Sequence, residues 1–470
     1  MGAQAVGVEA VTGRQRRLLT GPILPTLFGL AGPTLVVLLV QTGVGVAETC
    51  FVSNLGTAAL SGVTLVFPAL MLMQMMSNGG IGGGVSSAIA RALGAGRKDD
   101  ADALVLNAIL VAVMFGLIFT AAEWWGGAAL FRGMGGSGQE LEAALSYADI
   151  VFAGSVLIWL TSLLAAALRG AGNVMVPAAV TLVGAVVIVP LSPSLIFGWG
   201  PFPRLGVAGA GTAVMIYYLA AAAALLLYLR SRNSPLRLSF ALRRLRWRLL
   251  RDILRVGGVS AIGTVQMNLT VGIVTAMVGR YGADAVAGYG IASRLDYLLI
   301  PLLFGIGTGA LTMVGTNIGA GNYERARRIA WSAAAVAALV TEAIGLAVAG
   351  APHGWLGLFS KDAAVLATGT LYFRTVAPFY GLVGLGMLLY FSGQGAGRVF
   401  WPVMAGLARL LVAGLGGWLI VARLGLGLHA LFAAVATAAV AFGGITAVAA
   451  RLGPWGPPPV PVAEPERLSV

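Results

Sequence analysis

Twelve long apolar segments determine what this chain can fold into. A helix of about 20 apolar residues crosses the hydrocarbon core of a bilayer, and inside lipid only helices and closed barrels satisfy their own backbone hydrogen bonds. The segments are separated by charged or Gly/Pro-rich breaks and lie at residues 23–47, 57–80, 103–126, 145–167, 175–197, 207–229, 254–278, 284–312, 327–350, 364–391, 400–422 and 428–450. The chain is therefore predicted to be an all-α polytopic membrane protein with 12 transmembrane helices.

The composition excludes the main classes of soluble protein. Of the 470 residues, 58% are hydrophobic and only 10% are charged, whereas ordinary soluble domains carry about 25% charged residues. One cysteine and two histidines give no basis for an intrachain disulfide or for a metal centre built from Cys and His. The sequence has no P-loop motif, so ATP is not expected to be the energy source. We predict no enzyme activity, no cofactor and no resident metal.

The positive charges favour one orientation in the membrane. With twelve spans, 22 Lys and Arg residues fall on the side that holds both termini, including Arg169 in the loop after the fourth span, and five fall on the other side. Three more lie within spans, namely Arg294, Arg374 and Arg409. Cytoplasmic loops carry the excess of Lys and Arg, so both termini are predicted to be cytoplasmic. This bias explains the net charge of +13 without a nucleic-acid partner.

The sequence contains an internal repeat. The segment at 92–96 (ALGAG) matches 317–321 (NIGAG), and 169–173 (RGAGN) matches 394–398 (QGAGR), both at an offset of 225 residues. Six spans per repeat, an even number, give two halves of the same orientation, related by an axis along the membrane normal. Duplicated bundles of this kind hold their substrate at the interface between the halves and work by alternating access.

The repeat predicts how the chain is organised around a central cleft. We expect a cytoplasmic N-terminal tail at 1–22, an N-lobe of six helices at 23–229, a basic cytoplasmic linker at 230–253, a pseudo-symmetric C-lobe of six helices at 254–450 and a cytoplasmic C-terminal tail at 451–470.

Several segments resemble the multidrug and toxic compound extrusion (MATE) transporters of prokaryotes. They are AETCFVSNLGTAALSGV at 47–63, SSAIARALGAGRKDDADA at 86–103, LRGAGNVMVPAAV at 168–180, the stretch from ADAVAGYG to GNYERA at 283–326, and LYFSGQGAGRVFWP at 389–402. The resemblance covers about residues 20–450. It implies two six-helix lobes around a V-shaped cleft, and export of drugs or organic cations in exchange for inward H⁺ or Na⁺.

A coupling site needs a group that binds a cation inside the membrane. A carboxylate does so, because burial favours its neutral form. Acids in predicted loops, such as Asp100 and Asp102, are expected to be solvated, and five others lie in or at the ends of spans: Glu48, Glu123, Asp149, Asp296 and Glu342. Glu48 stands where similar MATE sequences place an acid in the first helix, which implies cation coupling. Alternatively, Glu48 is an interfacial residue at the outer end of that span, without a role in coupling.

Further polar residues are candidates for the wall of a substrate cavity. They are Gln41, Thr42, Gln74, Asn78, Ser192, Gln266, Asn268, Tyr289, Asp296 and Glu342. Glu342 lies in mid-span, where exposure to lipid is costly, so it is expected to face inward, toward Arg374 or Arg409. Glu123 and Asp149 flank an outer loop and are expected at the membrane interface.

The sequence departs from two cation sites of similar transporters. Many relatives have Asn and Asp four residues apart in the fifth span, where this chain has Ile188 and Ser192. Another branch has acids in spans seven and ten, which are missing here. H⁺ binding at Glu48 is therefore favoured over a multi-ligand Na⁺ site.

We predict a secondary active antiporter of the bacterial inner membrane, a monomer that exports cationic amphipathic drugs or metabolites in exchange for H⁺ or Na⁺. The alternative is a lipid or lipid-linked oligosaccharide flippase of the same superfamily. Such flippases resemble MATE transporters but often have more spans and a cleft rich in positive residues, whereas only three arginines fall within the predicted spans here.

Overall fold

The computed structural model describes residues 13–241, 244–453 and 455–456, and these are almost entirely helical. The elements are α1 (Gly13–Thr20), α2 (Ile23–Ser53), α3 (Thr57–Met75), η1 (Met76–Ile81), α4 (Gly82–Gly94), α5 (Lys98–Gly133), α6 (Gly138–Ala153), α7 (Ser155–Gly170), α8 (Met175–Phe197), α9 (Val207–Arg230), α10 (Trp247–Val278), η3 (Gly279–Tyr281), α11 (Ala283–Gly319), α12 (Tyr323–Gly350), α13 (Pro352–Leu356), α14 (Ala363–Val376), η4 (Ala377–Phe379), α15 (Tyr380–Gly395), α16 (Phe400–Leu411), η5 (Val412–Gly416), α17 (Gly417–Ala422) and α18 (Leu428–Leu452).

The predicted class of all-helical membrane protein is confirmed. Among the described residues, 11 helices are long and apolar enough to cross a membrane, or 12 when α6 and α7, which meet at a 50° bend, count as one broken span. The helices extend beyond the apolar segments, since α2 continues to Ser53 and α11 to Gly319. Helical backbone continues past the hydrophobic part of a span wherever no breaker follows, so hydropathy underestimates the length.

Two spans contain short π-helical turns, and both turns are rich in glycine. One is η1, with the sequence MSNGGI, and the other is η5, with the sequence VAGLG. Glycine lowers the cost of a local departure from α-helical geometry, and π-turns of this kind bend a helix or widen one of its turns. Residues of η1 take part in the candidate site described below.

The internal repeat has a counterpart in backbone geometry. Gly96 and Gly321 end the first pair of repeated turns with φ of 71° and 77°, and Gly172 and Gly397 end the second pair with φ of 74° and 72°. A positive φ is costly for residues other than glycine. Each glycine therefore closes its helix at the same point of its half.

Repeat-related residues also pack in equivalent ways where the two halves meet. A Cβ atom on Gly94 of α4 would lie 2.0 Å from the carbonyl oxygen of Thr316, and one on Gly319 of α11 would lie 2.1 Å from the carbonyl oxygen of Arg91. Positions 91 and 94 in the first half correspond to positions 316 and 319 in the second, at the offset of 225 residues. Each of these contacts is therefore the repeat equivalent of the other. Only glycine allows such close approach of two backbones, so the halves meet symmetrically at this point.

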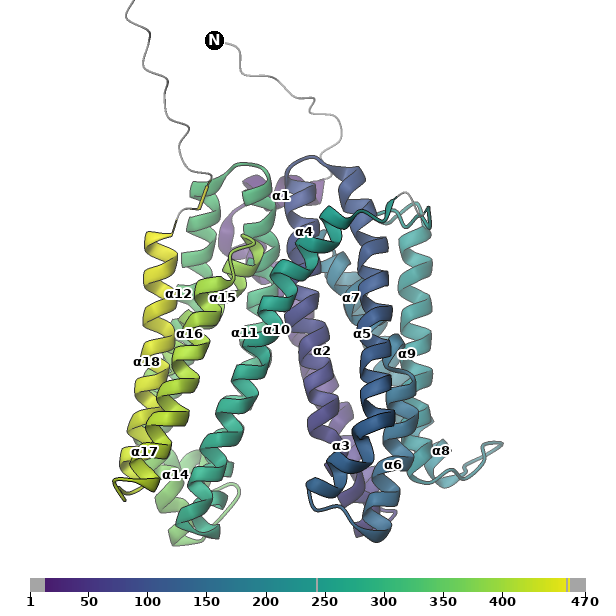
Figure 1. The fold of residues 1–470 in the computed structure, drawn as a ribbon. Coiled ribbons are helices and arrows are strands. Elements are labelled where there is room, and N and C mark those ends of the chain that lie inside the picture. The colour runs from purple at the N-terminus through teal and green to yellow at the C-terminus, as the bar shows by residue number, and fades with distance from the viewer. Residues whose placement is uncertain (1–12, 242–243, 454, 457–470) are drawn as a thin grey trace, which may run out of the picture.

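The helices form two groups that lie farther apart at one end of the molecule (Figure 1). One group contains α3 and α5–α9, and the other contains α10, α14 and α16–α18. α1 and the C-terminal end of α18 lie at the upper end in this view, where the groups are closer together. The chain begins and ends its described helices on one side, as an even number of spans requires.

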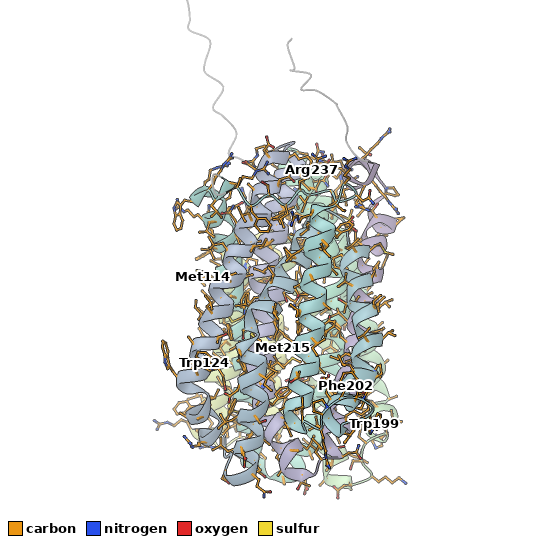
Figure 2. The ribbon with its side chains drawn as sticks, turned by 90° about the vertical axis from the view of Figure 1, so that its right-hand side faces the viewer. Met114, Trp124, Trp199, Phe202, Met215 and Arg237 are labelled. Atoms are coloured by element: carbon orange, nitrogen blue, oxygen red, sulfur yellow. The ribbon has the colours of Figure 1, made fainter. Side chains whose placement is uncertain are left out.

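The outer surface carries large apolar side chains along most of its height (Figure 2). Met114, Trp124, Trp199 and Phe202 are exposed there, and Trp124 retains 70% of its accessible surface. Arg237 lies at the upper end of the same view. An apolar surface of this extent is unfavourable in water and matches the hydrocarbon core of a bilayer.

Two acids of the predicted loops are buried, contrary to expectation. Asp100 and Asp102, in the first turns of α5, retain 7% and 5% of their accessible surface. Asp100 accepts hydrogen bonds from Arg97, Arg246 and Arg248 at 2.8–2.9 Å, and Asp102 accepts from Lys98 and from the backbone N–H of Arg237. The basic linker supplies three of these donors, so it is docked onto the start of α5.

Candidate functional site

A cavity of about 310 Å³ lies between the two halves of the chain. Its wall is formed by residues of α2, α3, α7, α8 and α9 from the first half and of α10, α11, α15, α16 and α18 from the second. This volume falls at the lower end of the range of small-molecule sites. The location matches the inter-repeat position at which duplicated transporters bind their substrates.

The cavity wall is predominantly apolar and aromatic, with a few amides. Its large side chains include Met71, Met75, Met267, Met387, Tyr217, Tyr218, Phe304, Tyr390, Phe391 and Phe442. The predicted residues Gln41, Gln74, Asn78 and Gln266 also line it. Aromatic and thioether groups adapt to varied amphipathic ligands, and the amides supply both donors and acceptors.

One face of α3 and of the π-turn that follows it lines the cavity. Met71, Gln74, Met75 and Asn78 line the cavity, whereas Met73 is fully buried in the core of the first half. Asn78 lies in the π-turn η1 and donates a hydrogen bond to the Gln74 carbonyl oxygen at 3.1 Å. The wall of the cavity on this side is therefore one face of α3 continued into η1.

Hydrogen bonds across the halves fix one side of the cavity. The Gln394 side-chain N–H₂ donates to the carbonyl oxygen of Gly79 at 2.9 Å and to the Tyr390 hydroxyl at 3.2 Å. The Tyr390 hydroxyl in turn donates to the Ser260 carbonyl oxygen at 3.2 Å. These bonds join η1 of the first half to α10 and α15 of the second, so they tie the wall together in this conformation.

The charged residues of the cavity wall are two arginines, one from each half. Arg169 comes from α7 and Arg409 from α16, and no carboxylate is among the described residues that form the wall. Arg169 was expected in a loop, but it lies in the last turn of α7, because this helix continues to Gly170. The apolar segment of this span ends at Ala167, about one turn before the helix does, so hydropathy alone places Arg169 in the loop.

Glu48 lies near the C-terminal end of α2, outside the wall of the cavity. The residue is half-buried, and its Oε1 atom is inaccessible and accepts no hydrogen bond from the described residues. Tyr147 and Tyr218 lie close enough to interact with it electrostatically, and Tyr218 lines the cavity. The role of Glu48 in coupling stays a prediction.

Asp296, the candidate acid of the second half, is held by two tyrosines. Its Oδ2 atom accepts a hydrogen bond from the Tyr372 hydroxyl at 2.5 Å, and its Oδ1 atom accepts one from the Tyr380 hydroxyl. Tyr289 packs edge-to-face on Tyr372, with ring centroids 5.3 Å apart. Neither Asp296 nor Tyr289 forms part of the cavity wall, although Arg409 interacts electrostatically with both.

Four more predicted residues also lie outside the cavity wall. Thr42 donates to the Leu38 carbonyl oxygen at 2.9 Å, and Ser192 is buried with no partner for its hydroxyl among the described residues. Asn268 donates to the Thr264 carbonyl oxygen at 2.9 Å and contacts the sulfur of Met75. The fourth is Glu342, which is described next.

Glu342 does not pair with the arginine that was expected. Its Oε2 atom accepts a hydrogen bond from the backbone N–H of Gly381 at 2.7 Å, which is near the start of α15. Arg374 is exposed, and Arg409 lies over the ring of Phe442 at 5.8 Å. A backbone donor at the start of a helix can stabilise a carboxylate as a side-chain partner does, a possibility that hydropathy does not reveal.

The remaining acids within the predicted spans also differ from each other. Asp149 is exposed, as expected of an interfacial residue, whereas Glu123 is buried and its Oε1 atom lacks a hydrogen-bond partner among the described residues. No group of three or more His, Cys, Asp and Glu residues in the described part of the chain could hold a metal ion.

Comparison with known proteins agrees with this architecture. The sequence model of the family MatE matches residues 33–194 and 260–419. An FAD transporter of Shewanella oneidensis is 27% identical over 406 residues, which are 84% of this chain and 87% of that protein. A probable multidrug resistance protein, NorM of Thermotoga maritima, is 25% identical over 378 residues, 80% of this chain and 81% of that protein.

Solved structures have the same fold over nearly the whole chain. A transporter of the MOP superfamily from Pyrococcus furiosus, described as having a binding pocket of reverse polarity that suggests a different function, superimposes with a TM-score of 0.84 at 25% identity. An outward-facing multidrug resistance transporter of the MATE family gives the same TM-score at 24% identity. Each comparison covers 94% of this chain and 98% of the other.

Proposed function

Because the chain belongs to the MATE family of membrane transporters, and is therefore no enzyme, we propose that it is a secondary active antiporter that exports amphipathic small molecules. The observation that carries this proposal is the cavity between the halves, whose wall contains methionines, aromatic rings and amides of both. Relatives named as an FAD transporter and as a probable multidrug resistance protein are in keeping with cargo of this kind.

The proposed transport cycle is alternating access by two lobes, at residues 23–229 and 254–450, with the linker at 230–253. At the end that holds α1, Arg91 of α4 pairs with Asp252 of α10 at 2.9 Å. Nearby, the Ser87 hydroxyl donates to the Gln394 carbonyl oxygen. The Ser87 contact crosses from one lobe to the other, and the Arg91–Asp252 pair joins the first lobe to the linker residues at the start of α10. Both contacts would have to break when the cavity opens toward that end.

Inward H⁺ is the proposed coupling ion, and Glu48 is its proposed binding group. A single carboxyl group with an unpartnered oxygen suits one proton, whereas Na⁺ prefers several oxygen ligands. We place both termini in the cytoplasm, on the basis of the positive charges, and the protein in a bacterial inner membrane as a monomer.

Two features of the cavity bear on the charge of the cargo. The sequence favours cationic substrates, for which the aromatic rings offer cation–π contacts. However, both charged side chains among the described residues of the wall are arginines. They also favour the second candidate function, a flippase for acidic lipids or lipid-linked oligosaccharides, which would use the same cavity.

Inverted membrane vesicles from a host without other efflux pumps test the proposal. A proton gradient is established, followed with a pH-sensitive dye, and challenged with ethidium, norfloxacin or FMN in the presence or absence of Na⁺. Loss of the gradient that requires both this protein and an added compound, without Na⁺, would support H⁺-coupled export. A response only with Na⁺ would identify Na⁺ as the coupling ion, and no response to any compound would contradict the exporter function.

A further inference from the structure

The charge of the cavity wall is unusual for a site that takes organic cations. Arg169 and Arg409 contribute positive charge from opposite halves, and no described residue of the wall contributes negative charge. A bound organic cation would thus meet two like charges in a medium where such repulsion is weakly screened. An acidic group would meet two attractive ones.

Neither guanidinium is neutralised by an ion pair among the described residues. The ion pairs of this part of the chain involve Arg91, Arg97, Lys98, Arg246, Arg248 and Arg328, all outside the cavity wall. The Arg169 guanidinium makes no hydrogen bond with the described residues, and Arg409 contacts the ring of Phe442. Keeping a guanidinium in a membrane interior without a partner is costly, so each arginine has bonding capacity left for a ligand.

Asp296 and Glu48, the candidate acids of the two halves, do not remove this positive charge. Asp296 acts on Arg409 through space, but both of its carboxylate oxygens already accept hydrogen bonds from Tyr372 and Tyr380. Glu48 lies outside the wall. With at most one of the arginines balanced by Asp296, the cavity keeps a net positive charge.

We propose that the cavity binds the acidic group, a carboxylate or a phosphate, of an amphipathic aromatic molecule, with Arg409 and Arg169 as its recognition residues. Guanidinium groups bind these oxyanions through paired hydrogen bonds. The ring of such a molecule would lie against the aromatic and methionine side chains of the same wall. This inference rests on the proposed function and specifies the substrate class of that site.

FMN and riboflavin form a matched pair of probes, because they share one aromatic ring system and differ in a phosphate. Binding of each is measured by fluorescence titration of the full-length protein in phosphatidylcholine nanodiscs, with ethidium as the cationic probe. We expect FMN to bind at least about tenfold more tightly than riboflavin. Ethidium is expected to bind more weakly than FMN.

Substitution of the two arginines tests whether they cause the preference for FMN over riboflavin. Arg409→Gln is expected to remove most of the preference for FMN and Arg409→Lys to restore part of it. Arg169→Gln provides an independent test from the other half should Arg409→Gln fail to fold. Arg374→Gln, which changes an exposed arginine of the second half, is the matched control and should bind like the wild type.

Anionic lipid is a second source of the same chemical group. Nanodiscs in which phosphatidylglycerol replaces part of the phosphatidylcholine distinguish a lipid headgroup from a soluble anion as the ligand. Competition of this lipid with FMN, lost in Arg409→Gln, would identify the acidic headgroup as an occupant, and undiminished FMN binding would identify a soluble anion.

Equal affinities for FMN and riboflavin, or tighter binding of ethidium than of FMN, would overturn the inference. Since binding is measured without an ion gradient, that result would leave the exporter function standing if the vesicles still exchange ethidium for protons. Retention of the FMN preference in both Arg→Gln variants would also overturn it.

Discussion

Glu48 in the first half and Asp296 in the second are both carboxylates inside the helical bundle, but their surroundings differ. An oxygen of Glu48 is buried without a hydrogen-bond partner among the described residues. Both oxygens of Asp296 accept hydrogen bonds from tyrosine hydroxyls. A carboxyl group that gains and loses a proton during transport needs surroundings whose hydrogen bonds do not fix it in its charged form. Glu48 meets this condition, whereas Asp296 is a fixed acceptor.

This difference separates a candidate for ion coupling from a structural acid. An unpartnered buried carboxylate is unfavourable, so it gains by binding a cation. A carboxylate that accepts two hydrogen bonds has its negative charge stabilised and organises the groups around it. We therefore expect substitution of Glu48 to affect coupling and substitution of Asp296 to affect stability.

The largest effect is expected for Glu48→Gln. The amide has nearly the same size as the carboxyl group but does not bind or release a proton at physiological pH. We expect substrate-driven proton exchange in inverted vesicles to fall to the level of vesicles without the protein, and pH dependence of export to disappear. Since no hydrogen bond to the unpartnered oxygen is lost, stability should change by less than about 1 kcal/mol.

Glu142→Gln is the control for this experiment, because it alters an exposed acid of the same half. It should exchange protons like the wild type. Normal exchange by a well-folded Glu48→Gln protein would remove Glu48 from the mechanism and place the coupling group elsewhere, with buried Glu123 as the next residue to substitute.

An intermediate effect is expected for Asp296→Asn. The neutral amide is a weaker acceptor than the carboxylate, and only one of its two polar atoms can accept from a tyrosine. The loss of charge-assisted hydrogen bonds is expected to cost about 2–3 kcal/mol. Thermal unfolding of the detergent-solubilised protein should therefore occur at a lower temperature, while proton exchange falls only several-fold. Complete loss of exchange at unchanged thermal stability would show instead that Asp296 is a second coupling group.

Much of the fold could be predicted from the sequence, because its signals are local. Apolar length gives the spans, and small-residue turns at a constant offset give the repeat, whose glycines have matching conformations. The ends of the helices were less predictable. Helices α5 and α7 extend past their apolar segments, which is why buried Asp100 and the cavity residue Arg169 were assigned to loops.

The site was harder to predict, because the hydrogen-bond partners of its acidic residues lie far away in the sequence. Gln74 and Asn78 were predicted as polar residues within a span, and both line the cavity, as their spacing of four residues on one helical face allows. The tyrosines that hold Asp296 lie 76 and 84 residues away, and Glu342 accepts from a backbone N–H 39 residues away. No local pattern encodes such pairs.

The smallest effect is expected for Tyr372→Phe. This change removes one hydrogen-bond donor to Asp296 but keeps the charge of Asp296, so it tests whether the hydrogen bonds distinguish Asp296 from Glu48. One oxygen of the carboxylate then lacks its hydroxyl partner, while Tyr380 still donates to the other. We expect a loss of about 1–2 kcal/mol in stability, smaller than that of Asp296→Asn, and nearly normal proton exchange. Combining Tyr372→Phe with Asp296→Asn should cost less than the sum of the two changes, because Asp296→Asn already weakens or removes the hydrogen bond that Tyr372→Phe deletes. Additive losses in thermal unfolding experiments would mean that this bond contributes nothing, and Asp296 would then resemble Glu48 more closely than its surroundings indicate.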